Sequence, residues 1–301
     1  MIRLRIFFLI ASIPSCSNNM KAYVACIPCY FRQALSSTEA VTKDAALQIK
    51  VLNEIARIVP KLDQNASPAH NSTIVLRAAN RILGVSDPYA EAKRHYNKLA
   101  LKMLPTLRKM VKEAENRILM AAKLAVVGNV IDLGIRAEIN IEATIDQVLG
   151  KGFAVDHTGR FLRMLDRPRS VLYLVDNAGE IVFDRLLIET LIDAGNTVTV
   201  GVKSGPILND CSMEDAEQVG LTEITEVIET GSDWVGTDLA TCSENFKKHF
   251  KDAYITVAKG QGNFETLGGA RKRLFFVLKA KCECVAQELG VKMGDLVFVG
   301  E

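Results

Sequence analysis

The sequence predicts an α/β protein: a mostly parallel, Rossmann-like sheet in a three-layer α/β/α arrangement, preceded by an all-helical region. Up to about Asp132, apolar residues recur with helical periodicity and without strand-like alternation. The character changes at Pro168, after which short β-branched or aromatic runs alternate with helix-like stretches. That alternation is typical of a parallel sheet covered by helices on both faces.

The helical region is expected over residues 20–165. Apolar residues at helical spacing make one face: Leu107, Met110, Val111, Ala114, Ile118, Ala121, Ala122 and Ala125. Loop signals interrupt the region at residues 65–68, at residues 84–88 and around Pro105. Ser86 is expected to start a helix, because Pro88 then falls in the first turn, where proline is tolerated.

The sheet domain is expected over residues 166–301. Its six predicted strands are Val171–Val175, Thr197–Val202, Glu226–Glu229, Tyr254–Val257, Leu274–Leu278 and Leu296–Val299. Helix-like stretches such as Ile181–Ala194 and Glu214–Val219 separate most of them.

Composition excludes several classes of function. The chain has 301 residues, 49% apolar and 24% charged, as in ordinary globular proteins. A net charge of +2 is far from the strongly basic surface that nucleic-acid binding usually requires. The seven cysteines are an odd number in a chain too large to need disulfide stapling, so a reducing, cytoplasmic setting is expected.

Residues 1–19 have a separate interpretation. Arg3 and Arg5, followed by Ile6–Ile13, imitate a short secretory signal, but cysteine usage argues against secretion. Because Met20 opens an ordinary globular sequence, we expect residues 1–19 to be a start-site artefact or a leader. No other segment approaches the roughly 20 apolar residues of a membrane span, so no membrane partner is expected.

Polar residues follow four of the predicted strands where each strand ends. These segments are Asp176–Glu180, Lys203 with Pro206–Asp210, Thr230–Asp233 and Lys259–Glu265. In an open parallel sheet, ligands bind beyond the carboxyl ends of the strands, so we expect these segments to form one site.

Asp176, Asn177 and Asp210 supply carboxylate and amide oxygens without a converging histidine or thiolate. Such donors favour a divalent cation such as Mg, Mn or Co. The alternatives are structural: Asn177 would cap the following helix, and Asp210 would be an N-cap ahead of acidic first-turn residues.

Two lysines and a glycine-rich turn suit a phosphate at the same edge. Lys203 and Lys259 would neutralise its charge, and backbone near Gly260 would donate hydrogen bonds, although single lysines are more often solvated. The implied reaction is phosphate-ester hydrolysis by a metal-activated water, with Asp176 or Glu180 steering the proton.

Five motifs taken together resemble the damage-control phosphatases, a family formerly known as a domain of unknown function. The motifs are Cys26-Ile27-Pro28-Cys29, Gly128–Asp132, Asp176–Glu180, Leu208–Asp210 and Lys259–Glu265. The resemblance runs from about Met20 to the C-terminus. The Cys-x-x-Cys pair is similar to that of the subfamily typical of prokaryotes.

The resemblance implies a helical subdomain packed on a Rossmann-like sheet and phosphatase activity on sugar phosphates or damaged phosphometabolites. It implies a divalent metal (manganese, cobalt, nickel or magnesium) held by Asp176, Asn177 and Asp210. Catalytic roles are expected for Asp176, Glu180 and Asp210. The residues expected to line the substrate or phosphate site are Asn129, Asp132, Lys203, Lys259, Gly260, Asn263 and Glu265. From the residues alone, Gly128–Asn129 would be a helix C-terminus.

Four cysteines suggest a second, separate site. Cys26 and Cys29 near the start, with Cys282 and Cys284 near the end, are a candidate four-thiolate zinc site. The second pair is C-x-C rather than C-x-x-C. Burial as structural cysteines and a redox pair are the alternatives.

Two other functions compete with the phosphatase. An S-adenosylmethionine-dependent methyltransferase would carry glycines directly after the first strand and an acidic residue after the second. This chain has Asp176-Asn177 after the first strand and Lys203 after the second, which argues against that class. A non-catalytic protein that binds a metal or a phosphometabolite is the second alternative.

Overall fold

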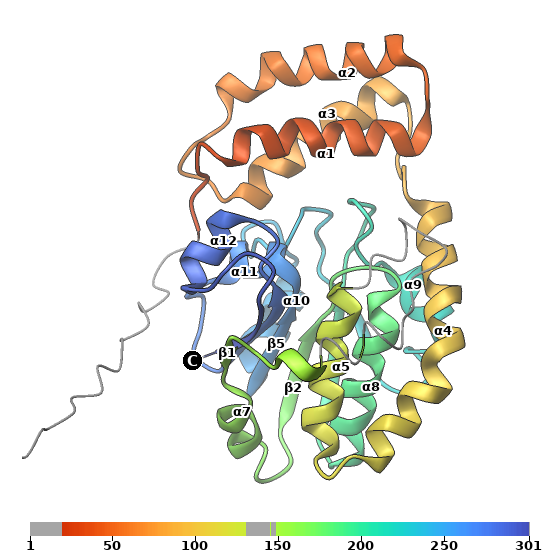
Figure 1. Ribbon diagram of the computed structural model, residues 1–301, viewed down its shortest axis with the longest axis vertical. Coiled ribbons are helices and arrows are strands. Elements are labelled where there is room, and N and C mark those ends of the chain that lie inside the picture. Colours follow the sequence, from red (N-terminus) through yellow and green to blue (C-terminus); the bar gives the residue numbers. More distant parts are fainter. Residues whose placement is uncertain (1–19, 131–144, 146–148, 301) are drawn as a thin grey trace, which may run out of the picture.

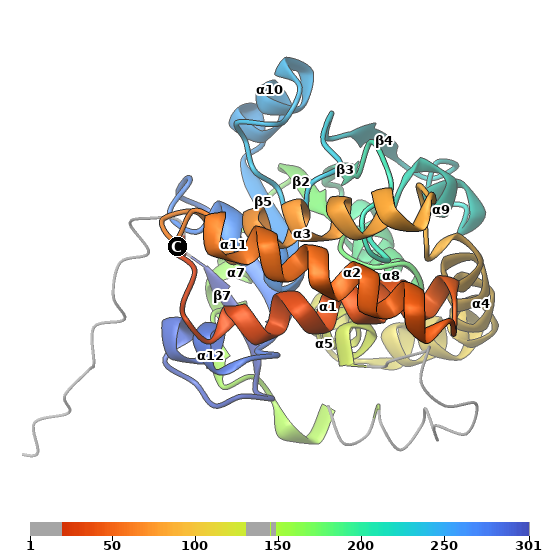
Figure 2. The same cartoon turned by 90° about the horizontal axis from the view of Figure 1, so that it is seen from above.

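The computed structural model describes residues 20–130, 145 and 149–300 (Figure 1). The leader expected at residues 1–19 and the predicted site residue Asp132 lie outside the described residues. Helices flank a single sheet. Three helices near the N-terminus lie across the ends of its strands (Figures 1 and 2).

The sheet has seven strands in the order β1-β7-β6-β5-β2-β3-β4. Their bounds are β1 (Val155–Asp156), β2 (Ser170–Leu174), β3 (Thr197–Val202), β4 (Glu226–Glu229), β5 (Ile255–Lys259), β6 (Leu274–Lys279) and β7 (Leu296–Gly300). Neighbouring strands are parallel except β6 and β7, which confirms the expected mostly parallel sheet. The sequence did not predict β1, whose two residues are too few to show alternation.

The side chains of β2 alternate between two hydrophobic cores, as the period of a strand requires. Val171 and Tyr173 pack in the first core, and Leu172 and Leu174 in the second. The first core is covered by α4 (Ala90–Glu113), α5 (Arg117–Val130), α7 (Thr158–Met164), α8 (Glu180–Asp193) and α9 (Met213–Gln218). The second is covered by α10 (Glu244–Asp252), α11 (Gly260–Leu267) and α12 (Glu283–Leu289). The expected three layers are therefore present.

Three N-terminal helices, which we call the cap, add their buried residues to the second core: α1 (Cys26–Val41), α2 (Ala45–Ile58) and α3 (Pro68–Leu83), with the 3-10 turn η1 (Val59–Lys61). The Ser67 hydroxyl caps the start of α3, and Gly84, with φ of 69°, ends it in the left-handed conformation. Thr73 of α3 accepts a hydrogen bond from the backbone of Val235, in the loop after β4 (3.0 Å). The cap therefore faces the loops at the carboxyl edge of the sheet (Figure 1).

The division between helical and sheet regions differs from the boundary expected at residues 165 and 166. The helices α4 and α5 come from the predicted helical region, yet they pack against α8 and share the first core. Their apolar faces are buried by the sheet layer rather than by the cap. β1 also precedes residue 166 and pairs with β7.

Three expectations for the helical region were wrong in detail. The helix expected from Ser86 begins at Ala90. α4 continues through Pro105, where the lost hydrogen bond is offset by burial of Leu104 and Leu107 on either side. The periodic apolar face belongs to two helices, because α4 ends before Ala114. Among the described helices, none is both long and apolar enough to cross a bilayer.

Candidate active site

The site lies where the order of the strands reverses. From β2 the chain builds the sheet outward through β3 and β4, whereas β5, β6 and β7 lie on the other side of β2. In such sheets the crevice at this switch point is the usual ligand site. Asp176 follows β2 and Gly260 follows β5, so the structure brings both to this crevice.

Gly260 and Asp176 are in close contact. Gly260 has φ of +81°, and a Cβ at this position would lie 1.9 Å from Asp176 Oδ2. Only glycine combines this backbone conformation with so close an approach to a carboxylate.

Gly260→Ala is therefore expected to displace the Asp176 carboxylate, lower activity by at least about 10-fold, and destabilise the protein by about 1 kcal/mol or more. Steady-state kinetics and urea unfolding would measure the two effects. Gly290→Ala is a matched control, because Gly290 also has positive φ but a Cβ added there would meet nothing within 4 Å. Equal loss of activity in both variants would show that the contact with Asp176 has no functional role.

Backbone hydrogen bonds join the loop after β2 to the loop after β3. Asn177 and Asp210 form an isolated antiparallel bridge. Cys211 N donates to Asp176 O (2.8 Å), and Ala178 N donates to Asn209 O (2.9 Å). The structure thus brings together Asp176, Asn177 and Asp210, the residues that the sequence suggested as metal ligands.

Asp176, Glu180 and Asp210 form a carboxylate cluster, and amide side chains hold the first two of these residues. The Asn129 amide donates to Asp176 Oδ2 (3.2 Å) and to Glu180 Oε2 (2.9 Å). The Asn177 amide donates to the same two oxygens at 2.7 and 3.3 Å. Asn129, the predicted wall residue, therefore bridges two members of the cluster.

The carboxylate cluster concentrates negative charge. Burial raises the pKa of Asp176 well above its ordinary value, and the carboxylates of Glu180 and Asp210 raise it further. Burial also raises the pKa of Asp210 to about 6, against the opposing charge of Lys203. Burial acts in the same direction on Glu180, but Lys259 and Lys281 hold the pKa of Glu180 below its ordinary value.

The donor chemistry fits a divalent cation. Within the described part of the chain, no group of three or more histidine, cysteine, aspartate or glutamate side chains is arranged to hold a metal ion. The candidate set instead has two carboxylates, Asp176 and Asp210, and one amide, Asn177. Oxygen donors of this kind, beside carboxylates that repel one another, suit a hard cation.

Lys259 lies elsewhere than expected. β5 continues two residues beyond Val257, so Lys259 ends the strand with 0% of its surface exposed. Its ammonium donates to Ala125 O (2.9 Å), Glu180 Oε1 (2.6 Å) and Asp184 Oδ1 (2.5 Å). An ammonium has three donors, so all are used inside the protein. The structure therefore does not support direct contact of Lys259 with a phosphate.

Lys203 is also engaged within the protein. Its ammonium lies 3.6 Å from Asp210 Oδ2 and donates to the carbonyl oxygens of Trp234 (2.7 Å) and Gly236. This lysine links Asp210 to the loop after β4, and two of its three donors are used by carbonyl oxygens of that loop.

Asn263 and Glu265, two further predicted substrate contacts, make hydrogen bonds with residues outside the carboxylate cluster. Asn263 donates to Lys259 O (2.8 Å) and accepts from the Thr237 hydroxyl (2.7 Å). Glu265 accepts from Gln261 (2.8 Å) and from the backbone N–H of Ala69 at the start of α3. Their contacts join α11 to the neighbouring loop and to the cap.

Glu265 should make stability depend on pH. Burial raises the pKa of this carboxyl from 4.5 to about 7, so the folded state favours its neutral form. Below pH 4.5 the neutral Glu265 carboxyl makes its full contribution to the free energy of unfolding. That free energy should fall by about 3 kcal/mol as pH rises to about 7, because ionising the buried carboxyl costs more in the folded state. Glu265→Gln should remove this dependence, which urea unfolding at several pH values would measure. Parallel curves for the wild type and Glu265→Gln would contradict it.

Comparison with known proteins decides the family. The model of the damage-control phosphatase ARMT1-like domain matches residues 22–297. The chain belongs to this family. The family resemblance noted in the sequence is thereby confirmed, whereas the Cys-x-x-Cys subfamily stays a prediction.

Relatives of the chain cover nearly its whole length. A damage-control phosphatase of Pyrococcus horikoshii is 34% identical over 92% of this chain and 97% of the relative. A damage-control phosphatase of Archaeoglobus fulgidus is 32% identical over 92% of this chain and 98% of the relative. A crystal structure of a DUF89 family protein from P. horikoshii matches with a TM-score of 0.84 and 33% identity, over 93% of this chain and 99% of that one. These relatives support phosphatase activity in this chain.

The cysteines of this family member join the cap to α12. Cys26, at the start of α1, is in hydrogen-bonding contact with Cys284 of α12, which also contacts Cys282. All four of the predicted thiolate ligands are free cysteines. Burial raises the pKa of the Cys26 thiol to about 12, with Cys284 adding to the effect. No three of these four thiols are arranged to hold a metal ion in the described structure, and the contacts suit structural burial. The four-thiolate zinc site stays a prediction.

Asp184 and Lys281 lie at the site although the sequence analysis did not select them. Asp184 follows Glu180 by one helical turn and lies among apolar residues of α8. A single carboxylate in such a stretch indicates that it is buried and paired with a cation or a hydrogen-bond donor. Lys281, just after β6, has the appearance of a solvated surface lysine.

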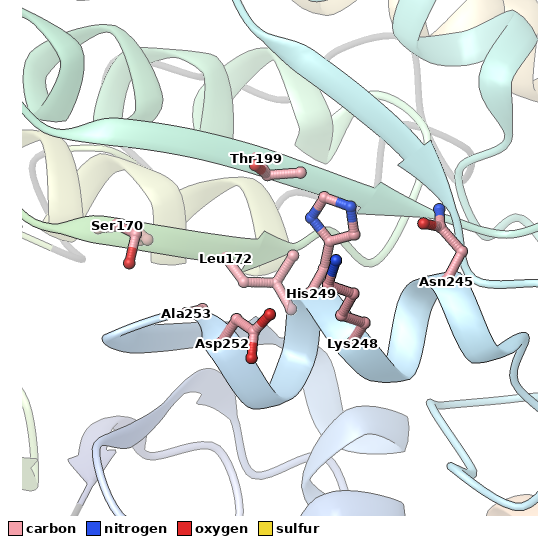
Figure 3. A pocket seen from close by; sticks show the side chains of 9 residues that line it. Ser170, Leu172, Thr199, Asn245, Lys248, His249, Asp252 and Ala253 are labelled. Carbon is pink, nitrogen blue, oxygen red and sulfur yellow. The ribbon is translucent and has the colours of Figure 1, made fainter.

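A hollow of about 220 Å³ lies away from the carboxylate cluster (Figure 3). It lies between the beginning of β2, at Ser170, and α10, at Lys248 and His249. Asp176 lies beyond the opposite end of β2, so this hollow is not part of the candidate active site.

Proposed function

We propose that this chain is a metal-dependent phosphatase that hydrolyses phosphate monoesters of small metabolites, such as sugar phosphates or damaged phosphometabolites. The observation that carries the proposal is the meeting of Asp176, Asn177 and Asp210 at the switch point of the sheet. Family membership supports the phosphatase part of the proposal, and the oxygen donors support the metal part.

Asp176, Asn177 and Asp210 would hold manganese, cobalt, nickel or magnesium, which when bound supplies charge neutralisation and a water of lowered pKa. Asn129 orients Asp176 and Glu180 through its amide. Both Glu180 oxygens are occupied by donors, so we assign to Asp176 the proton of the attacking water.

The test is phosphate release from an aryl phosphate by the full chain, stripped with chelator and then supplied separately with Mg, Mn, Co, Ni or Zn. Turnover restored by one or more of the metals is the expected result. A folded protein that binds metal without turnover would instead be a binding or sensing protein. A panel of sugar phosphates would then test the substrate class, because an aryl phosphate reports only the chemical step.

A further inference from the structure

The two loops that carry the proposed metal ligands each lead into a helix, and one further helix packs against both. The loop after β2 holds Asp176 and Asn177 and leads into α8, and the loop after β3 holds Asp210 and leads into α9. α4 packs against α8 and against α9 (Figure 1). A polar side chain buried on this face of α4 can therefore contact both loops.

Asn97 is such a side chain, in the interior of α4 and with 0% of its surface exposed. Its Oδ1 accepts a hydrogen bond from Gly179 N (2.6 Å), at the end of the loop after β2. Its Nδ2 donates to Asp215 Oδ1 (2.9 Å) and to Gln218 Oε1 (2.8 Å), both in α9. A reversed amide would set N–H against N–H at Gly179 and oxygen against the Asp215 carboxylate, so the contacts allow one orientation of the amide.

Gly179 needs an acceptor from outside its own helix. It is the N-cap residue of α8, and the first N–H groups of a helix have no partner within that helix. In a capping box, the side chain three residues further on accepts from the N–H of the N-cap residue. Val182 occupies that position in α8 and has no acceptor in its side chain. Asn97 supplies the acceptor from α4, and thereby holds a residue only two positions after Asn177.

Asp215 extends these contacts to the loop after β3. Its Oδ2 accepts from Ser212 N and from Ser212 Oγ, both at 2.9 Å. Ser212 lies two residues after Asp210. The hydrogen bonds from Gly179 through Asn97 and Asp215 to Ser212 therefore join the two loops a short distance behind the proposed ligands.

We propose that Asn97 is a positioning residue of the metal site, which holds the loop after β2 and the loop after β3 at the separation that a shared cation requires. This assignment rests on the proposed function. An amide suits the role because it accepts on one side and donates on the other, so one side chain holds a backbone N–H and a carboxylate. Asn97 acts on the proposed ligands through Gly179 and Asp215.

Asn97→Leu should raise the Kd of Mn by roughly 10- to 100-fold, the usual effect of removing a side chain that orients metal ligands. Leucine has a similar volume, so the variant loses the hydrogen bonds more than the packing. Lys93, 3.4 Å from Asp215 Oδ2, and Ser212 still contact that carboxylate in the variant. Calorimetric titration of the full chain with Mn measures the Kd without turnover.

Asn196→Leu is the matched control. Asn196 is also a buried amide: its Oδ1 accepts from Arg169 N (3.0 Å), and its Nδ2 donates to Leu191 O (2.9 Å). It precedes β3, whereas Asp210 follows that strand. Both variants should lose stability in urea unfolding, but Asn196→Leu should bind Mn as the wild type does. Wild-type Mn affinity in Asn97→Leu, or an equal loss of affinity in both variants, would overturn the inference.

A second pair of variants decides the question if Asn97→Leu does not fold. Asn97→Asp alone brings two carboxylates together at positions 97 and 215. Asn97→Asp combined with Asp215→Asn reverses the hydrogen bond between these positions and keeps an acceptor for Gly179. Tighter Mn binding by the double variant than by Asn97→Asp supports the inference, and equal binding rejects it.

The same titrations separate this inference from the proposed function. If the wild type binds Mn but hydrolyses no ester, the proposed function fails, and the Mn affinities of the variants still decide the role of Asn97. A wild type that binds none of Mg, Mn, Co and Ni in calorimetry would overturn the inference together with the proposed metal site.

Discussion

Asp176→Ala is expected to reduce phosphatase activity by at least roughly 10²- to 10³-fold, while leaving the fold intact. Asp176 receives hydrogen bonds from Asn129 and Asn177 and is in close contact with Gly260, so no neighbouring side chain can take its place. Because burial and the neighbouring carboxylates raise its pKa, its removal relieves repulsion. The free energy of unfolding should therefore stay the same or increase.

The measurements for Asp176→Ala are kcat/KM with saturating metal and urea unfolding of the same preparation. Asp210→Ala should lose activity similarly, since it removes the other proposed carboxylate ligand. Asp193→Ala is the matched control, because Asp193 is exposed at the far end of α8 from the site. Full activity in Asp176→Ala would contradict the site, and a collapse of stability would contradict the repulsion argument.

Much of the fold could be predicted because local sequence carries the relevant signals. Buried parallel strands require short apolar runs, and six of these appear within a few residues of β2 to β7. Local sequence does not show which other element covers the apolar face of a helix. The apolar face of α5 shows that the helix is buried, but not that α8 and the sheet, rather than the cap, bury it.

The candidate site divides in the same way. Asp176, Asn177 and Asp210 could be predicted as neighbours because strands of one parallel sheet end at one edge. The role of Lys259 could not, because a lysine is buried only when partners from other elements neutralise it. Those partners, Glu180 and Asp184, come from α8. A rule based on strand ends alone therefore does not reveal that the donors of Lys259 are engaged inside the protein.

Lys259→Met should destabilise the protein by about 3–5 kcal/mol, because it leaves the Glu180 and Asp184 carboxylates buried without their cation. Both carboxylates are almost completely buried, and even beside Lys259 burial raises the pKa of Asp184 to about 7. Methionine has a similar length, so the loss reflects charge more than a cavity. Urea unfolding at pH 7 would measure it.

Lys259→Met combined with Asp184→Asn separates charge from packing. Neutralising Asp184 removes one of the two stranded carboxylates, so the double variant should recover part of the lost stability. The Tyr173 hydroxyl can still donate to the remaining amide oxygen, as it does to Asp184 Oδ1 at 2.8 Å. If the double variant instead loses as much stability as the two single variants together, the cost of Lys259→Met comes from packing rather than from charge. Wild-type stability in Lys259→Met with loss of activity alone would return Lys259 to the role of a phosphate contact.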